Sequence, residues 1–489
     1  MSAVVLASVL FAPSAVAEEL AGCQFNDVVD FNGDGFEDVA VADDQADVDG
    51  MVAAGRVHVL FGGSVGTVTL SLADPFVPGD PIGGGRFGTV LDTFDVNLDG
   101  CDDLVVGAPY ESVDGANEAG AVYILPGSPA GFGTQPTTRY TQQGFTGLVA
   151  EQGDQFGFSI DAAHRFDGLP YLAVGAPGEA IGPLSNAGGV LLLAAGASTW
   201  LHQDIIGIAG EAEAGDRFGH AVVAGERHVA IGVPGEDIDG FADAGSAHLF
   251  GHDAGPSAVL EIAVLNQRDD DQSGAIEEDD RYGWSLSMES FDDVSIGRST
   301  ILAVGAPGEA IGEHQEAGRV VSAVVVTATG AVLEQASIHQ AVDGVFGASE
   351  PGDEFGWTVE IVNRSPEEVP EWSDLMLAVG IPGEEGEPLT DTGAVQLFSL
   401  IGAPGDHDVW VDATVLGPEW TATSAARMGE HIAASSTHLY VGDPDGTGAV
   451  YLVSWTNLLL NGTDPVRVIR PGHDGVPSAG AVSFGTAMV

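Results

Sequence analysis

Short apolar runs recur along the chain, and each is followed by the same Gly-x-Pro signature. Six clear copies lie at residues 105–109, 173–177, 230–234, 303–307, 378–382 and 440–444, and a degenerate seventh lies at 41–44. Successive copies are 57–75 residues apart, which is the spacing of a repeated supersecondary unit. The pattern predicts seven units, each with a buried strand at this position.

Two further marks accompany each run. An aromatic-Gly pair precedes five of the clear copies and Met-Gly precedes the last, at Phe87-Gly88, Phe156-Gly157, Phe218-Gly219, Tyr282-Gly283, Phe355-Gly356 and Met428-Gly429. A Gly and an alternating strand follow, as at 120–125, and a less regular fourth strand leads to the next unit, as at 258–264. Four short strands in each of seven units predict an all-β fold, a seven-bladed β-propeller with four-stranded blades.

The two ends of the chain are expected to close this ring. The first unit has no clear aromatic-Gly strand, whereas residues 483–489 supply one that resembles residues 86–91. An open ring would leave unpaired strand edges. We therefore predict that residues 484–489 pack beside residues 39–41 or 57–60. The alternative is that they begin an eighth repeat.

Two loops carry oxygen side chains at a spacing that suits a hard cation. Positions 1, 3, 5 and 9 are acidic or amide residues, position 6 is Gly, and position 7 would offer its backbone carbonyl. The expected ligands are Asp30, Asn32, Asp34, Phe36 and Asp38 in the first loop and Asp95, Asn97, Asp99, Cys101 and Asp103 in the second. Each loop runs directly into an apolar strand. We interpret both as Ca²⁺ sites, with a plain acidic turn as the alternative.

These marks resemble FG-GAP repeats, which form the seven-bladed propeller of integrin alpha subunits and of many bacterial surface proteins. The resemblance covers the chain from about Gly22 onward and implies one calcium ion for each intact loop, held by positions 1, 3, 5, 7 and 9. Only the first two units match this loop residue by residue. The third unit has residues 161–167 in its place, and the fourth, sixth and seventh units also lack the loop, so calcium is not expected there.

A third acidic loop has similar spacing but a different position. Asp269, Asp271, Ser273 and Glu277 precede Tyr282-Gly283, which is not where the resemblance places the calcium loop. It reads as an insertion between the fourth and fifth blades. Metal binding there stays open.

The charge of the chain is extreme. Asp and Glu number 73 against 14 basic residues, all of them Arg, and the formal net charge is −59. Such a surface repels nucleic acid and anionic lipid and attracts cations. Acidic residues also follow Gly-x-Pro-Gly in four units, at Glu179, Glu236, Glu309 and Glu384. They predict a rim of carboxylates, which either reflects turn chemistry or attracts cations.

The N-terminal residues favour export. Residues 1–17 are mostly apolar and end in Ala15-Val16-Ala17, so we interpret them as a signal peptide, with the propeller at 18–489. Cys23 ends a stretch that resembles a lipobox, but two preceding glutamates disfavour lipidation. Because Cys23 and Cys101 fall in different repeats, we do not expect a disulfide between them. No apolar run elsewhere is long enough to span a bilayer.

The expected function is that of a secreted or cell-surface calcium-binding propeller, a binding or adhesion module for an extracellular protein or glycan. We do not expect an enzyme, because the chain has few arginines with which to bind an anionic sugar. The alternatives are a polysaccharide-degrading enzyme on a propeller scaffold and a purely structural surface or matrix protein.

Overall fold

The structure is a computed structural model of the chain. It describes residues 23, 28–63, 66–145, 147–194, 197–252, 259–267, 274–365, 370–386, 388–417, 420, 423–460, 462–478 and 480–489. The expected signal peptide at 1–17 lies outside the described residues. Among the described residues, no helix has the length and apolar character needed to cross a membrane.

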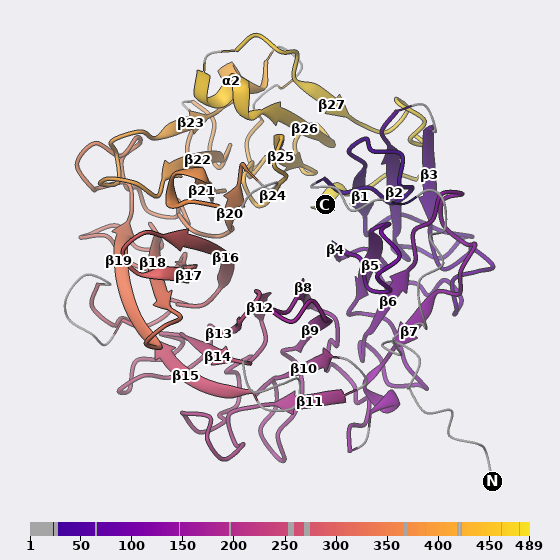
Figure 1. Cartoon of the computed structure of the whole chain (residues 1–489), viewed down its shortest axis with the longest axis horizontal. Coiled ribbons are helices and arrows are strands. Elements are labelled where there is room, and N and C mark those ends of the chain that lie inside the picture. Colours follow the sequence, from indigo (N-terminus) through magenta and orange to yellow (C-terminus); the bar gives the residue numbers. More distant parts are fainter. Residues whose placement is uncertain are drawn as a thin grey trace.

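The chain forms a ring of seven four-stranded antiparallel sheets, and this confirms the predicted β-propeller (Figure 1). The strands of each blade are given from the innermost to the outermost. Blade one contains β28 (Phe484–Met488), β1 (Val39–Asp43), β2 (Arg56–Phe61) and β3 (Gly66–Leu70). Blade two contains β4 (Val90–Phe94), β5 (Asp103–Ala108), β6 (Ala121–Leu125) and β7 (Thr138–Tyr140). Blade three contains β8 (Ser159–His164), β9 (Pro170–Ala176), β10 (Gly189–Ala194) and β11 (Ala197–Leu201).

The remaining blades repeat this order. Blade four contains β12 (Ala221–Ala224), β13 (His228–Val233), β14 (Ser246–Gly251) and β15 (Leu260–Leu265). Blade five contains β16 (Ser285–Asp293), β17 (Gly297–Ala306), β18 (Arg319–Val326) and β19 (Ala331–Ile338). Blade six contains β20 (Val359–Asn363), β21 (Leu375–Ile381), β22 (Ala394–Ser399) and β23 (Val409–Val411). Blade seven contains β24 (His431–Ala434), β25 (His438–Asp443), β26 (Ala449–Ser454) and β27 (Arg467–Ile469).

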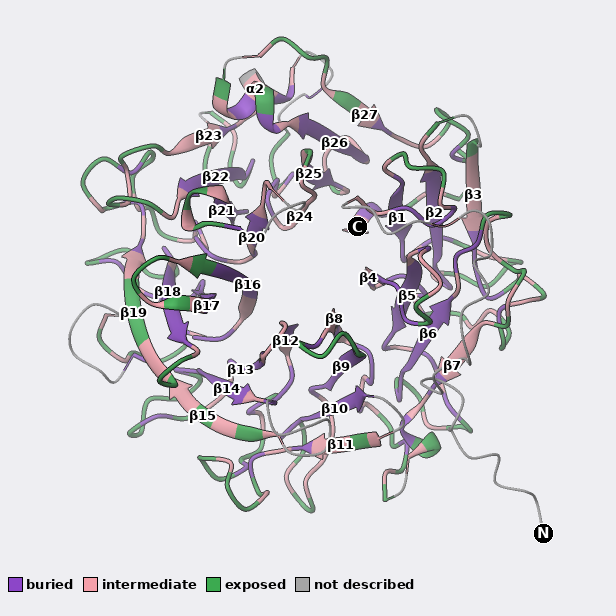
Figure 2. Ribbon diagram, viewed as in Figure 1, coloured by how far each residue is buried: buried purple, intermediate pink, exposed green. Residues whose placement is uncertain are grey.

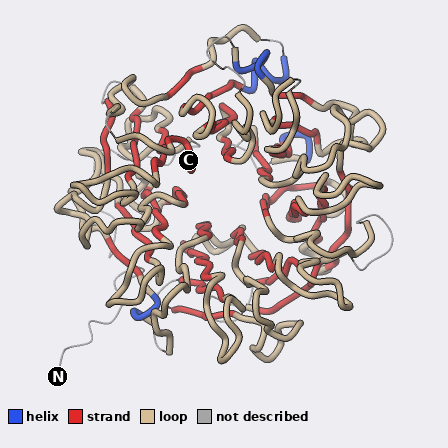
Figure 3. Tube along the Cα trace, turned by 180° about the vertical axis from the view of Figure 1, so that it is seen from behind, coloured by secondary structure: helices blue, strands red, loops and turns tan. Residues whose placement is uncertain are grey.

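Helical segments are few and short in the described part of the chain. They are η1 (Gln142–Gly144), η2 (Trp372–Asp374), α1 (Ala413–Leu416) and α2 (Trp455–Leu460). Helix α2 lies at the outer edge of the ring, as the view from behind also shows (Figure 3).

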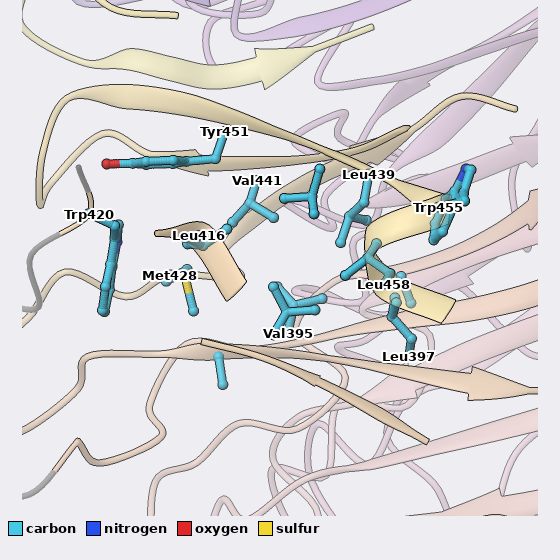
Figure 4. Close-up of a cluster of buried hydrophobic side chains, with 14 of the residues drawn as sticks. Val395, Leu397, Leu416, Trp420, Met428, Leu439, Val441, Tyr451, Trp455 and Leu458 are labelled. Carbon is cyan, nitrogen blue, oxygen red and sulfur yellow. The ribbon is translucent and has the colours of Figure 1, made fainter. Parts of the chain in front are cut away.

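The hydrophobic core lies between the blades. Side chains alternate across each strand, so Val39 and Val41 of β1 pack against blade seven while Ala40 and Ala42 pack against blade two. The second and third strands are therefore buried on both faces and read as continuous apolar runs, whereas the outermost strands are partly exposed (Figure 2). Figure 4 shows one such layer, in which Val395 and Leu397 of blade six meet Leu439 and Val441 of blade seven.

The Gly of each Gly-x-Pro copy sits where adjacent blades touch. A Cβ atom on Gly175 of blade three would lie 2.1 Å from the carbonyl oxygen of Gly219 in blade four. The equivalent distances are 2.5 Å for Gly107 to Gly157, 2.0 Å for Gly232 to Gly283, 2.2 Å for Gly305 to Gly356, 1.9 Å for Gly380 to Gly429 and 2.3 Å for Gly442 to Gly485. A side chain does not fit at these distances, so glycine is required where the backbones of neighbouring blades touch.

The C-terminus closes the ring, as predicted. Strand β28 pairs antiparallel with β1, with Met488 opposite Val41 and Phe484 opposite Asp43. The backbone amide of Ala40 donates to the carbonyl oxygen of Val489 at 2.9 Å, and the reverse bond measures 3.1 Å. Of the two positions expected for this segment, the structure selects the one beside residues 39–41. The eighth-repeat alternative is wrong, because the segment completes the first blade.

We expect deletion of residues 483–489 to lower the free energy of unfolding by about 5 kcal/mol or more, because the buried side chains of Phe484 and Met488 leave the core. Replacement of Phe484 by Ala should cost about 3–5 kcal/mol on its own. Val482→Ala is the control, since this side chain is exposed. Chemical unfolding curves measure the effect, and a truncated chain as stable as the full one would show that β28 does not close the ring.

Candidate metal centre

Both predicted calcium loops lie on one face of the ring. The second loop joins β4 to β5, the innermost and second strands of blade two. The first loop leads into β1, the second strand of blade one, whose innermost strand comes from the C-terminus. Both loops thus immediately precede the second strand of their blade. The second loop lies inside a hairpin, whereas the first loop enters its blade from the N-terminal side.

In the first loop, backbone amides hold the acidic side chains in a tight turn. Asp30 accepts hydrogen bonds from the amides of Gly33 at 2.7 Å and Gly35 at 2.8 Å. Gly33 and Gly35 adopt φ of 68° and 82°, and this left-handed backbone makes the turn. One carboxylate oxygen from each of Asp30, Asp34 and Asp38 lies within 4.8 Å of the other two. The structure thus brings together the three predicted carboxylate ligands of this loop.

The predicted amide and carbonyl ligands belong to the same turn. The side-chain oxygen of Asn32 accepts from the amide of Asp34 at 2.9 Å, and Asp34 accepts from the amide of Phe36 at 3.0 Å. The Phe36 side chain is exposed, so this residue has its backbone carbonyl to offer and not its ring. All five predicted positions therefore offer oxygen ligands.

The second loop repeats the turn with less convergence of its carboxylates. Asp95 accepts from the amides of Asp99 at 3.1 Å and Gly100 at 2.9 Å, and Asp99 accepts from the amide of Cys101 at 3.1 Å. Asn97 points its amide nitrogen toward Asp103 at 3.5 Å. Among the residues that the structure describes, Asp95, Asp99 and Asp103 are not gathered within 4.8 Å as the first loop's carboxylates are. An ion here would draw these side chains inward.

The ninth residue of each loop also has a structural role. Asp38 accepts from the amides of Phe31 at 2.9 Å and Gly62 at 2.7 Å. Asp103 accepts from the amide of Val96 at 3.1 Å and from that of Gly127 at 2.9 Å. In both blades, this carboxylate ties the start of the second strand to the turn that follows the third strand.

The electrostatics of the loops favour a cation. Burial raises the pKa of Asp38 to about 7, with further contributions from the neighbouring carboxylates Asp30 and Asp34. Burial likewise raises the pKa of Asp103 to about 8, with further contributions from Asp95 and Asp99. Carboxylate, amide and carbonyl oxygens are the donors that Ca²⁺ prefers, so the residues present fit that ion.

The two loops touch each other, which the sequence analysis did not anticipate. The amide of Asp30 donates to the carboxylate of Asp102 at 2.8 Å, and the amide of Asp102 donates to the carbonyl oxygen of Asp30 at 3.1 Å. The expectation that Cys23 and Cys101 stay unpaired is wrong, because they form a disulfide with a Cα–Cα distance of 5.1 Å. The cysteines belong to different repeats, but neighbouring blades bring them together. Their sulfur atoms are therefore not metal ligands.

Of the four candidate ligands in the third acidic loop, the structure describes Glu277 alone. Asp269, Asp271 and Ser273 lie outside the described residues. Glu277 is exposed, and its amide donates to the carboxylate of Asp280 at 2.6 Å. Glu277 precedes β16, at the end of the blade opposite the other two loops.

The sequence did not predict a cavity of about 460 Å³ that is lined by the β8–β9 and β12–β13 hairpins of blades three and four and by strands β16 and β17 of blade five. Arg298 lines it and donates to Glu226 from Nε at 3.1 Å and from Nη2 at 2.8 Å. Arg165, which is buried, pairs with Asp167 at 3.1 Å. Two of the chain's few arginines line this cavity, Arg165 just after β8 and Arg298 within β17, and neither belongs to the repeated motif.

Comparisons with known proteins agree with the repeat pattern. The FG-GAP repeat family model matches residues 87–125, within blade two. Integrin alpha-PS2 of Drosophila melanogaster is 36% identical over 154 residues, which are 30% of this chain and 11% of that protein. Phosphatidylinositol-glycan-specific phospholipase D of Bos taurus is 32% identical over 111 residues, which are 21% of this chain and 13% of that protein. The matched segments thus span only about a tenth of these relatives.

Among solved structures, a Lactobacillus plantarum protein aligns with 93% of this chain and 98% of its own, at 10% identity and a TM-score of 0.46.

We expect the free energy of unfolding in a chelator to fall as the pH rises from about 4 to about 8. The pKa values of Asp38 and Asp103 are about 7 and 8 when folded, against 3.8 when exposed, so the folded state binds more protons and loses stability as they leave. If the deprotonated loops hold Ca²⁺, excess Ca²⁺ should weaken this dependence. Thermal unfolding across this pH range measures both. Other buried carboxylates, such as Glu179 and Glu360, also have raised pKa values, so Asp38→Asn with Asp103→Asn should reduce the slope of the chelator curve without abolishing it. An unchanged slope in this double variant would contradict the assignment.

Proposed function

We propose that this chain, an FG-GAP propeller similar to those of integrin alpha subunits, is a calcium-stabilised binding module that acts outside the cell. Its partner would be an extracellular protein or glycan. The observation that carries the proposal is the convergence of Asp30, Asp34 and Asp38 in a loop that contacts an equivalent loop in the next blade.

Calcium follows from the donors and their placement. Three carboxylates close together repel one another unless a cation neutralises them, and oxygen ligands with flexible geometry suit Ca²⁺ better than the smaller Mg²⁺. Asp30, Asn32, Asp34 and Asp38 would hold one ion together with the Phe36 carbonyl. Asp95, Asn97, Asp99 and Asp103 would hold a second with the Cys101 carbonyl. The ions would order the loops and link blade one to blade two.

A position outside the cytoplasm is supported by the disulfide between Cys23 and Cys101, since disulfides persist in oxidising compartments. The bridge also occupies the sulfur atom that a lipid anchor on Cys23 would need. Secretion or display at the cell surface is therefore proposed without lipidation of Cys23.

A binding role suits the architecture. A rigid ring presents many loops on two faces, and such loops are where recognition residues gather. The integrin relative shares this repeat, although the matched segment is a small part of it. Fold alone does not fix function, so the ligand has to be found by experiment.

The first test counts calcium ions. Asp34→Ala and Asp99→Ala should each remove one bound Ca²⁺ and lower the melting temperature in calcium. An ion present at a hundred times its Kd stabilises a protein by about 2.7 kcal/mol. Asp80→Ala is the matched control, because Asp80 is an exposed carboxylate outside the loops. Titration calorimetry that finds unchanged stoichiometry in both variants would refute calcium binding by the loops.

The second test screens the whole chain on protein and glycan arrays in Ca²⁺ and in chelator. We expect retention of a defined ligand that weakens in chelator and in the Asp34→Ala variant. Glycan cleavage would instead favour the enzyme alternative, for which the cavity with Arg165 and Arg298 and the phospholipase relative are the supporting observations. No retention of any protein or glycan would favour a structural surface or matrix role.

A further inference from the structure

A second set of acidic groups lies on the opposite face, where the chain passes from one blade to the next. Four blades contain the same three residues: a Gln two residues after the outermost strand of the preceding blade, an Asp two residues before the aromatic-Gly pair, and the Glu that follows Gly-x-Pro-Gly. We call each set a junction cluster. The clusters are Gln142, Asp154 and Glu179 in blade three, Gln203, Asp216 and Glu236 in blade four, Gln267, Asp280 and Glu309 in blade five, and Gln340, Asp353 and Glu384 in blade six.

The three residues of a cluster are held together by specific contacts. The side-chain amide of Gln142 donates to Glu179 at 2.6 Å, and that of Gln340 donates to Glu384 at 2.6 Å. The same bond joins Gln203 to Glu236 and Gln267 to Glu309.

The Asp of each cluster lies against the Gly that precedes the Glu. The amide of Gly178 donates to the carbonyl oxygen of Asp154 at 3.1 Å, and that of Gly383 donates to the carbonyl oxygen of Asp353 at 3.1 Å. One carboxylate oxygen of each Asp accepts an amide hydrogen bond from the residue three positions earlier, for instance from Glu350 to Asp353 at 2.6 Å. The turn therefore fixes the Asp carboxylate and leaves its other oxygen free to bind something else.

Several buried oxygens in these clusters have no partner. Oε1 of Gln142, Gln203 and Gln340 and Oδ1 of Asp216, Asp280 and Asp353 accept no hydrogen bond from any described residue. These six side chains belong to residues that are at most 4% exposed. A buried acceptor without a partner costs about 1–3 kcal/mol. Its recurrence at equivalent positions indicates a ligand that the protein chain does not itself provide.

In two blades, an arginine side chain pairs with the glutamate at this position. In blade two, Glu111 occupies the position of these glutamates and pairs with Arg139 at 2.6 Å. In blade five, Glu309 pairs with Arg319 at 3.1 Å. Within the described part of the chain, no arginine pairs with Glu179, Glu236 or Glu384. Burial, together with the nearby Asp154, raises the pKa of Glu179 to about 7.

We propose that the junction clusters of blades three, four and six each bind a hard metal cation, Ca²⁺, between their Asp, Glu and Gln oxygens. The cation takes the place that a guanidinium occupies in blades two and five. All the donors are oxygens, and a pair of carboxylates with an amide carbonyl matches the preference of Ca²⁺. These sites go beyond the proposed function and do not depend on the acidic loops of blades one and two. Each would fasten a blade to the segment that enters it.

The test counts Ca²⁺ bound to the full-length chain by equilibrium dialysis after removal of metal, at pH 7.5 and constant NaCl. Glu179→Gln, Glu236→Gln and Glu384→Gln should each lower the count by one. Glu309→Gln is the matched control and should leave the count unchanged, since Arg319 already neutralises that cluster. In chelator, the first three variants should melt no lower than the parent, because each removes a buried charge. In Ca²⁺ they should gain less stability than the parent.

An unchanged count in all three variants, with a higher melting temperature in both chelator and Ca²⁺, would overturn the proposal and show that the clusters hold a proton or a water molecule. Asp353→Asn gives a second measurement on blade six, because it removes the other carboxylate of that cluster, and it too should lose one ion. Loss of ions in Asp34→Ala or Asp99→Ala but in no junction variant would sustain the proposed function and refute these three sites.

Discussion

The contact that the rest of the fold depends on is the approach of two backbones at each blade junction. A Cβ atom at Gly380 would lie 1.9 Å from the carbonyl oxygen of Gly429 in the next blade, so the strands meet with no side chain between them. This close approach sets the spacing at the axis, and the apolar layers between blades fill the space further out. The glycine of the Gly-x-Pro motif therefore marks a contact between two repeats. Because the apolar layers also lie between neighbouring blades, a single blade has no core of its own.

Charge is the second constraint, and it follows from composition. With a net charge of −59, the chain gains stability wherever a cation neutralises carboxylates that folding brings together. The first acidic loop gathers its carboxylates within one turn of the sequence, whereas each junction cluster gathers side chains from three separate segments. Arg139 and Arg319 show that the chain can provide the cation itself. Burial, with a further contribution from Asp154, holds the pKa of Glu179 above the usual range.

The repeat could be predicted from sequence because it is local: the strand, its glycine and the acidic loop are each a few residues long. Closure by residues 484–489 was also predictable, since the missing strand of the first unit and the surplus strand at the end share one pattern. The disulfide was not, because it requires knowing that Cys23 and Cys101 lie at the boundary between neighbouring blades. The same holds for Gln142, whose role depends on Glu179, 37 residues away and in the next blade.

The first loop also lies beside the junction where the ring closes. Its Glu37 accepts hydrogen bonds from Thr437 at 2.7 Å and from Tyr440 at 2.9 Å, both in blade seven. Its Asp30 contacts Asp102 in blade two. A single loop thus touches both neighbours of the blade that is built from the two ends of the chain. Strands β28 and β1 come from opposite ends of the chain and are joined only by hydrogen bonds and packing. An ordered first loop would therefore reduce the entropy cost of bringing these two strands together.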